Sequence, residues 1–194
     1  MLEPMRFDKL REVDVTRMIE SIGGKRASSD DSREMSGNAD YILGNAVIEL
    51  KFLDQERLLS LKDKSKITEM FAWDDAPVIV LDPGRLDEDS RKRFRSIQRQ
   101  PIENQIKTAA KQFRSIRDRA PETTINVCMV INNGYWSIGH DSLKELVVNR
   151  ATHSTREIDY VVIAGIYYHS DGFDNIILAP IDFETIRSGK PDFT

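Results

Sequence analysis

Residues Asn38 to Leu53 read NADYILGNAVIELKFL, and this stretch decides how the rest of the chain is organised. Two short apolar runs flank Gly44-Asn45, a dipeptide typical of a tight β-hairpin turn. Side chains alternate between the faces of a strand, so Glu49 and Lys51 point to the same side as Val47. Burying an unpaired charge in so apolar a strand costs several kcal/mol, which indicates that these charged residues have a function.

The length and composition predict one globular domain with a sizeable core. The chain has 194 residues, of which 40% are hydrophobic and 31% charged, a balance typical of folded rather than disordered proteins. No apolar run approaches the ~20 residues that span a membrane, and the first residues lack the apolar core of a signal peptide. The single cysteine, Cys128, excludes an internal disulfide framework and a cysteine-based zinc cluster. We therefore expect a cytoplasmic protein with no membrane contact.

The charge of the chain is unevenly distributed. The formal net charge is −4, yet the segment from Arg91 to Arg119 holds ten basic residues and only two acidic ones, Glu103 and Asp118. This segment therefore carries a local charge of +8, and the remainder of the chain is strongly acidic. A basic face on an acidic body suits phosphate binding, although solvated helix charge accounts for the same pattern.

Hydrophobic periodicity predicts helices that alternate with strands, as in an α/β or α+β sheet protein. Residues 25–37 are expected to form a loop, with or without a short edge strand, and Pro101 is expected to separate two helices. The predicted helices are Phe7–Ile22, with Asp14 as a candidate N-cap inside it, Gln55–Phe71, Leu86–Gln100, Ile102–Arg119 and Ser142–Asn149. The predicted strands beyond the hairpin are Pro77–Leu81, Thr124–Ile131, Ile158–Tyr168 and Asn175–Ala179.

The charged residues of the hairpin suit phosphodiester hydrolysis. Mg²⁺ prefers oxygen ligands, and Asp40 and Glu49 on adjacent strands can converge on one ion, with the backbone carbonyl of Leu50 as a further ligand. Lys51 could orient a water molecule or stabilise charge on the phosphate during attack. The alternative is a Glu–Lys pair at the surface, worth under ~1 kcal/mol.

Asp40 followed by Glu49-Leu50-Lys51 at the end of an apolar strand resembles the PD-(D/E)XK nuclease superfamily, the restriction-endonuclease-like fold. The resemblance implies a mixed central sheet flanked by helices, with the core order α-β-β-β-α-β. It covers about residues 15–131, so that 132–194 would add strands to the same sheet within a single domain 1–194. The family also implies a glutamate on the preceding helix and a glutamine on the following one, which correspond to Glu20 and Gln105.

The sequence departs from the family pattern at two places. Ala39 stands before the first acid, where many members have proline. The insertion Phe52–Pro101 is longer than the minimal core requires, and this makes the position of the glutamine less certain than the Asp–Glu–Lys set.

The resulting hypothesis is a nuclease that requires Mg²⁺ or Mn²⁺ and hydrolyses phosphodiester bonds, with DNA as the expected substrate. RNA cleavage by the same site is one alternative. A second is a catalytically silent subunit on the same fold that binds nucleic acid or protein. A homodimer or a larger complex is compatible with each reading. Candidate phosphate contacts are the basic residues of the helical segments, namely Lys92, Arg93, Arg95, Lys107, Lys111 and Arg114.

Other reactive residues carry weaker patterns. Cys128 lies inside a strand-like apolar run and is expected in the core. The three histidines, His140, His153 and His169, lack the spacing of metal ligands, which favours structural or surface roles. Trp73, Tyr135 and Trp136 could stack on bases, but packing is the favoured interpretation.

Overall fold

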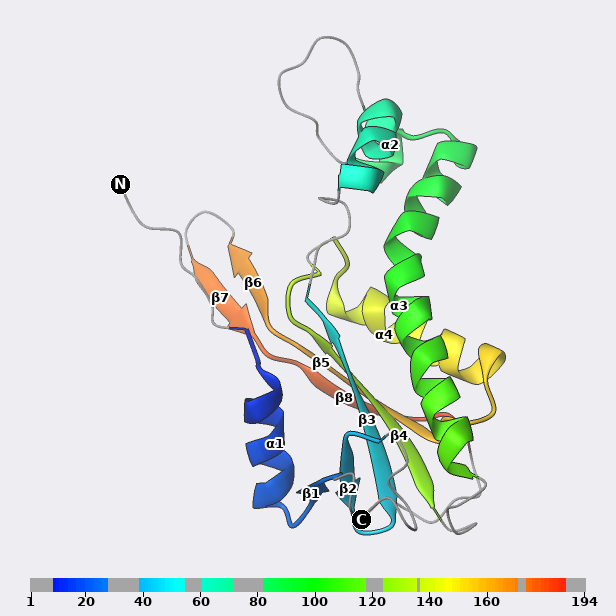
Figure 1. Cartoon of the computed structure of the whole chain (residues 1–194). Coiled ribbons are helices and arrows are strands. Elements are labelled where there is room, and N and C mark those ends of the chain that lie inside the picture. The colour runs from blue at the N-terminus through cyan, green and yellow to red at the C-terminus, as the bar shows by residue number, and fades with distance from the viewer. Residues whose placement is uncertain are drawn as a thin grey trace.

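The computed structural model describes residues 9–27, 39–54, 61–71, 82–117, 124–135, 137–170 and 174–187. Within these ranges the chain is an α/β protein with a six-stranded mixed sheet and four α-helices (Figure 1). The elements in chain order are α1 (Glu12–Ser21), β1 (Lys25–Arg26), β2 (Tyr41–Leu43), β3 (Ala46–Leu53), α2 (Leu61–Phe71), a 3-10 turn η3 (Pro83–Arg85), α3 (Glu88–Arg117), β4 (Ile125–Asn132), α4 (His140–Ser154), β5 (Tyr160–Gly165), β6 (Tyr167–Ser170), β7 (Asn175–Leu178) and β8 (Ile181–Thr185).

The predicted hairpin lies within the sheet, whose strand order is β1-β2-β3-β4-β5-β8. Gly44 takes a φ of +57° in the turn, a conformation that glycine adopts at no steric cost. Strands β3, β4 and β5 are parallel, and Glu49 stands opposite Cys128 in the register. The apolar run around Cys128 is thus a central strand paired on both sides, which confirms the strand predicted there.

Helices cover both faces of the sheet (Figure 1). On one face, α3 and α4 pack against residues such as Val47 and Val130. On the other, Val15 and Ile19 of α1 pack against Ile48, with Leu50 in the same cluster. Because side chains alternate along β3, Glu49 and Lys51 lie on the face that α3 and α4 cover.

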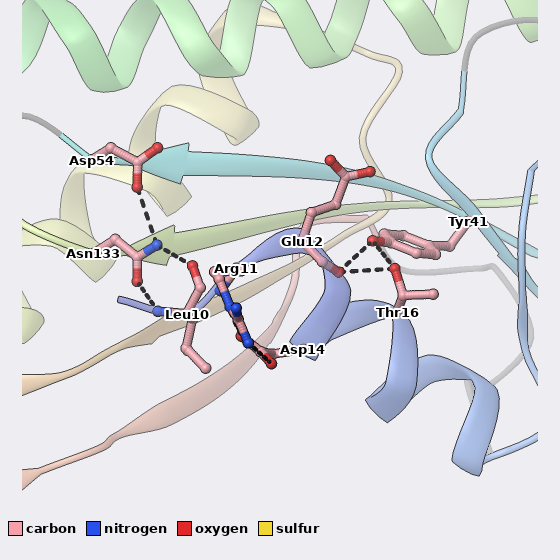
Figure 2. Close-up of polar contacts among 8 residues, drawn as sticks. All are labelled: Leu10, Arg11, Glu12, Asp14, Thr16, Tyr41, Asp54 and Asn133. Atoms are coloured by element: carbon pink, nitrogen blue, oxygen red, sulfur yellow. Dashed lines mark hydrogen bonds and ion pairs between the residues drawn. The ribbon is translucent and has the colours of Figure 1, made fainter. Parts of the chain in front are cut away.

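Side-chain hydrogen bonds fix α1 to the sheet (Figure 2). The amide of Asn133, just after β4, accepts a hydrogen bond from the Leu10 N–H at 3.1 Å and donates one to the Leu10 carbonyl at 2.6 Å. Farther along the helix, the hydroxyl groups of Thr16 and Tyr41 are 3.0 Å apart. Hydrogen bonds thus connect the residue before α1 to the end of β4 and the middle of α1 to β2, and together they hold the helix on the sheet.

The start of α1 differs from the sequence-based expectation. The helix was predicted to begin at residue 7, with Asp14 as a candidate N-cap. In the structure Arg11 is the N-cap, and the Asp14 carboxylate accepts a hydrogen bond from the Arg11 N–H at 2.9 Å. Asp14 is therefore inside the first turn, where a carboxylate is favoured by the helix dipole.

The predicted break at Pro101 is wrong, because α3 runs without interruption from Glu88 to Arg117. Proline removes one backbone donor and crowds the preceding turn, but it does not prevent a helix whose flanking turns pack well. Phe94 is buried against α2 before the proline, and Ile102 is buried against the sheet after it. Packing on both sides therefore outweighs the local cost.

The C-terminal part of the sheet also differs from the prediction. The strand expected over 158–168 is two strands, because β5 ends at Gly165 and β6 begins at Tyr167 in a separate two-stranded sheet with β7. Strand β8 was not predicted, although its residues alternate between apolar and acidic side chains. Its Asp182 accepts hydrogen bonds from His140 at 2.6 Å and Lys144 at 3.1 Å, which fix β8 to α4.

Other predictions agree with the structure or fall outside its described part. Helix α4 is longer than the predicted Ser142–Asn149, and β1 provides the short edge strand allowed in the 25–37 segment. The predicted strand Pro77–Leu81 lies outside the described residues. The predicted helix Gln55–Phe71 corresponds to α2, and its residues 55–60 also lie outside the described part. In the described part of the chain, no helix is both long and apolar enough to span a membrane.

Candidate active site

Glu49 and Lys51 form an ion pair inside the protein. The Glu49 side chain is completely buried, and only 11% of the Lys51 side chain is exposed. The Lys51 Nζ lies 2.5 Å from Oε1 of Glu49. The surface-pair alternative is therefore wrong, and two charges in the interior need further polar partners to offset their lost hydration.

Asp40 is held beside this pair by the backbone of the hairpin. Its N–H donates to the Ile48 carbonyl at 3.1 Å, and its own carbonyl accepts from the Ala27 N–H at 2.9 Å. The Asp40 Oδ2 accepts from the Leu50 N–H at 2.8 Å. The N–H and C=O of one strand residue point to the same edge, so the Leu50 carbonyl is also directed toward the Asp40 side.

Helix α3 contributes a glutamine, but at a different position from the predicted one. The Lys51 Nζ donates to Oε1 of Gln112 at 2.9 Å. Gln105 is seven residues earlier in α3, which places it on the same helix face about two turns, or ~10 Å, away along the axis. The structure thus brings Gln112, and not Gln105, to the Asp–Glu–Lys set.

Glu20 is not close to this set. It is an exposed residue of α1, and α1 covers the sheet face opposite to the one that carries Glu49 and Lys51. Its neighbour Ile19 is the residue that points into the sheet. The glutamate that the family resemblance assigned to Glu20 is therefore not part of the set, because this side of α1 faces solvent.

Burial strongly affects the acid of the ion pair. The pKa of Glu49 is raised from 4.5 to about 7, mainly by loss of hydration and in part by the nearby Asp40 carboxylate, while the Lys51 hydrogen bond acts in the opposite direction. Burial also raises the pKa of Cys128, on the neighbouring strand, to about 12. A thiol with so high a pKa is inert at neutral pH, which agrees with the core role predicted for Cys128.

The oxygen atoms of the set fit a divalent cation. Glu49 Oε2 is buried and has no hydrogen-bond partner among the described residues, so it is an acceptor with unsatisfied capacity. With Asp40 and the Leu50 carbonyl it makes a set of hard oxygen donors, which Mg²⁺ and Mn²⁺ accept. The described residues contain no group of three or more His, Cys, Asp or Glu side chains suited to a metal. An ion here would be held by the two carboxylates, the Leu50 carbonyl and water molecules.

The candidate phosphate contacts all belong to α3. They are exposed, and most of them follow one another at helical spacing along the outside of that helix. A pocket of about 400 Å³ lies along the first half of this row. Its basic lining residues are Lys92, Arg95, Arg99 and Lys107. Lys111 and Arg114 continue the row on either side of Gln112, so basic side chains flank the buried site.

The remaining candidates have structural roles where they are described. The buried Tyr135 donates its hydroxyl hydrogen to the Gln98 carbonyl at 2.7 Å, so it packs and does not stack on a ligand. His140 pairs with Asp182, and His153 is bound to the Asn149 carbonyl. Trp73 and Trp136 lie outside the described residues, as does the side chain of His169.

Comparisons of the chain with protein-family models, with curated proteins and with solved structures find no match.

Proposed function

We propose that this protein is a metal-dependent nuclease of the PD-(D/E)XK type, with DNA as its substrate. One observation carries the proposal: Asp40, directly before β2, and Glu49 and Lys51, in the adjacent strand β3, meet at a single place in the sheet. A buried carboxylate beside a second carboxylate and a lysine is costly to maintain, and hydrolysis of a phosphodiester uses all three groups.

Each residue has a distinct role in this proposal. Glu49, Asp40 and the Leu50 carbonyl would hold Mg²⁺ or Mn²⁺, which supplies Lewis-acid polarisation of the phosphate and a more acidic bound water. The Lys51 ammonium has three N–H donors, of which the described contacts to Glu49 and Gln112 use two. The third donor is available to orient the attacking water or to stabilise charge on the phosphate. Gln112 positions Lys51 for this task.

The basic row on α3 supports a nucleic-acid substrate. From Lys92 to Arg114 the row extends over ~33 Å of helix, close to one turn of B-form DNA. Glu103 interrupts the row, but its carboxylate lies 3.5 Å from Arg150 of α4, which offsets its charge. A phosphate backbone that follows this row would pass Gln112 and reach the side of Asp40, which is only half-buried.

The order of elements is consistent with the restriction-endonuclease-like fold. Elements α1, β1, β2, β3, α3 and β4 follow the family's order α-β-β-β-α-β, with α2 inserted before α3. We therefore extend the proposal from the site to the fold. Of the strands after β4, β5 and β8 are the additions expected in the same sheet, whereas β6 and β7 form a separate sheet.

The decisive experiment is a cleavage assay with single- and double-stranded DNA and RNA in the presence of Mg²⁺ or Mn²⁺. We expect wild-type protein to cut DNA, EDTA to stop cleavage, and Glu49→Gln and Lys51→Met each to reduce the rate at least about 100-fold. Arg17→Gln, an exposed α1 variant, is the control for charge and handling. Unchanged cleavage in both site variants, with folding confirmed by circular dichroism, would contradict the proposal.

One observation favours the second candidate, a catalytically silent binding subunit. Glu49 is completely buried and already bound to Lys51, as in a polar network that only fixes β3 against α3. The same assay separates the two candidates. A silent subunit would bind nucleic acid through α3 without any metal-dependent cleavage, whereas cleavage of RNA alone would change the substrate but keep the site.

A further inference from the structure

A second polar pocket lies away from the candidate active site, where α3 and α4 both end. Its volume is about 430 Å³. Gln112 of α3 turns toward β3 and Lys51, whereas Arg114, two residues later, contacts Glu157 in the segment before β5. The pocket is lined by Arg114, Thr152, His153, Ser154, Thr155, Arg156, Glu157 and Arg187.

The lining is rich in hydrogen-bond donors and positive charge. Three arginines face one carboxylate, that of Glu157, so the formal charge is +2 with His153 neutral. Arginine presents five N–H donors in a fixed planar arrangement, and it remains charged at every accessible pH. The hydroxyl groups of Thr152, Ser154 and Thr155 complete the wall, and that of Thr152 already donates to the Val148 carbonyl at 2.8 Å. We propose that this pocket binds a phosphate group, because a tetrahedral dianion matches both the charge and the donors.

An unsatisfied donor supports the proposal. The Nε of Arg187 is buried and has no hydrogen-bond partner among the described residues. Another nitrogen of the same guanidinium, Nη2, donates to the Thr155 carbonyl at 2.5 Å and so fixes the plane of the group. A buried N–H without an acceptor is costly, so this guanidinium, which lines the pocket, has donor capacity that its described contacts do not use.

The end of α4 explains only part of this charge. The C-terminus of a helix carries about half a negative charge and attracts cations. The Arg187 guanidinium offsets this charge, because it donates to the carbonyl of Thr155, the C-cap of α4. Arg114 approaches from α3, and its Nε lies 3.5 Å from the Glu157 carboxylate. Even with the helix dipole and Glu157 included, the three guanidinium groups leave the pocket positive.

The pocket is built on rigid backbone. The Glu157 carbonyl accepts from the Asn126 side chain at 2.8 Å, and the Asp159 side chain accepts from the Asn126 N–H at 2.9 Å. The Arg187 N–H donates to the Asp159 carbonyl at 3.1 Å. These contacts fix the segment before β5 and the end of β8 to β4, so the arginines are placed before any ligand arrives.

Two sources could supply the phosphate group. It could belong to a nucleic-acid backbone that follows the α3 row down to Arg114, or to a small phosphate compound. The chemistry of the pocket is the same for both. This proposal goes beyond the nuclease proposal and does not need cleavage, so either one can fail without the other.

The test is a calorimetric titration of the full chain with inorganic phosphate at constant ionic strength. We expect saturable binding by the wild type and at least about tenfold weaker binding by Arg156→Gln and by Arg187→Gln, since each removes charge-assisted hydrogen bonds. Arg187→Gln loses a hydrogen bond of the fold and could bind weakly because it is misfolded. Arg156 is exposed and makes no described contact, so weaker binding by Arg156→Gln cannot be explained in that way. Arg17→Gln on α1 removes the same charge far from the pocket and should bind like the wild type.

A competition arm distinguishes the sources. If inorganic phosphate displaces a short single-stranded DNA from the wild type, and Arg156→Gln weakens both ligands, the pocket takes a backbone phosphate. If DNA binding is unaffected by phosphate, the ligand is a small phosphate compound. The proposal is overturned if the wild type shows no saturation at about 10 mM phosphate, tenfold above the 1 mM Kd of a weak site, or if Arg17→Gln weakens binding equally.

Discussion

The ammonium nitrogen of Lys51 in β3 lies 2.9 Å from the side-chain oxygen of Gln112 in α3. This hydrogen bond joins the central sheet to the longest helix at the point where the basic row passes the buried acid. It also restricts the lysine to one orientation, with its nitrogen beside Glu49. A positioned lysine next to a buried carboxylate is the arrangement from which the nuclease proposal is built.

Gln112 is the glutamine that we expect to support activity. Gln112→Ala removes an acceptor of Lys51 and should lower the cleavage rate about 10- to 100-fold, as is usual for residues that orient a catalytic group. Gln105→Ala, about two turns earlier on the same face of α3, is the matched control and should cleave within about twofold of the wild type. The opposite ranking of the two variants would restore the family-based assignment of Gln105.

The raised pKa of Glu49 predicts a specific pH dependence of stability without metal. The folded pKa of about 7 exceeds the usual 4.5, so the folded protein binds this proton more tightly than the unfolded chain. The stabilisation from the neutral acid is complete below pH 4.5 and is lost as the pH rises to 7 and above. Relative to Glu49→Gln, the wild type should lose up to about 3 kcal/mol of unfolding free energy between pH 5 and pH 8. Urea denaturation in EDTA at both pH values measures this difference, and parallel pH profiles of the two proteins would refute it.

The same titration predicts how metal affinity changes with pH. A cation held by Glu49 and Asp40 displaces the Glu49 proton, so its apparent affinity should fall by up to about tenfold per pH unit below pH 7 and level off above it. Thermal unfolding with increasing Mn²⁺ reports this as a rise in Tm that is larger at pH 8 than at pH 6. Asp40→Asn should abolish the rise at both pH values. A rise that persists in Asp40→Asn would place the ion elsewhere.

The basic row on α3 predicts the salt dependence of DNA binding. Lys107→Gln together with Lys111→Gln removes two phosphate contacts and should reduce the slope of log K against log salt by about 2. Fluorescence anisotropy with a labelled duplex, at several salt concentrations, gives the slope. Arg17 lies on α1, which covers the sheet face opposite to α3, so Arg17→Gln should leave the slope unchanged. Equal slopes in the double variant and the wild type would remove these two lysines from the interface.

Local sequence patterns predicted the centre of the fold and of the site, but not its surroundings. The hairpin and β4 follow from turn chemistry and from uninterrupted apolar residues, which act over a few positions. The meeting of Asp40 with Glu49 follows from the hairpin alone. Gln112 could not be selected over Gln105, because periodicity defines which residues share a helix face but not the position of the helix along its axis relative to the sheet. Glu20 was misplaced for a related reason, since the family pattern assigns a glutamate to the preceding helix but does not fix which sheet face that helix covers.

Pro101 shows the limit of local propensity most directly. Proline in a helix interior costs about 3 kcal/mol or more, and for that reason the sequence predicted a break. Phe94 and Ile102 are both buried, with 3% and 1% of their surfaces exposed, so the helix is anchored on either side of the proline. If packing supports α3 against the cost of Pro101, removing that cost should make the protein more stable.

We therefore expect Pro101→Ala to raise the unfolding free energy by about 1–2 kcal/mol, because it restores a backbone N–H to the helix at a small loss of rigidity in the unfolded chain. Urea denaturation measures the change as a higher midpoint with an unaltered slope. Ser96→Ala, an exposed substitution in the same helix, is the control and should change the free energy by less than about 0.5 kcal/mol. A lower midpoint for Pro101→Ala would mean that a bend at the proline is needed for Phe94 and Ile102 to reach their separate clusters at once.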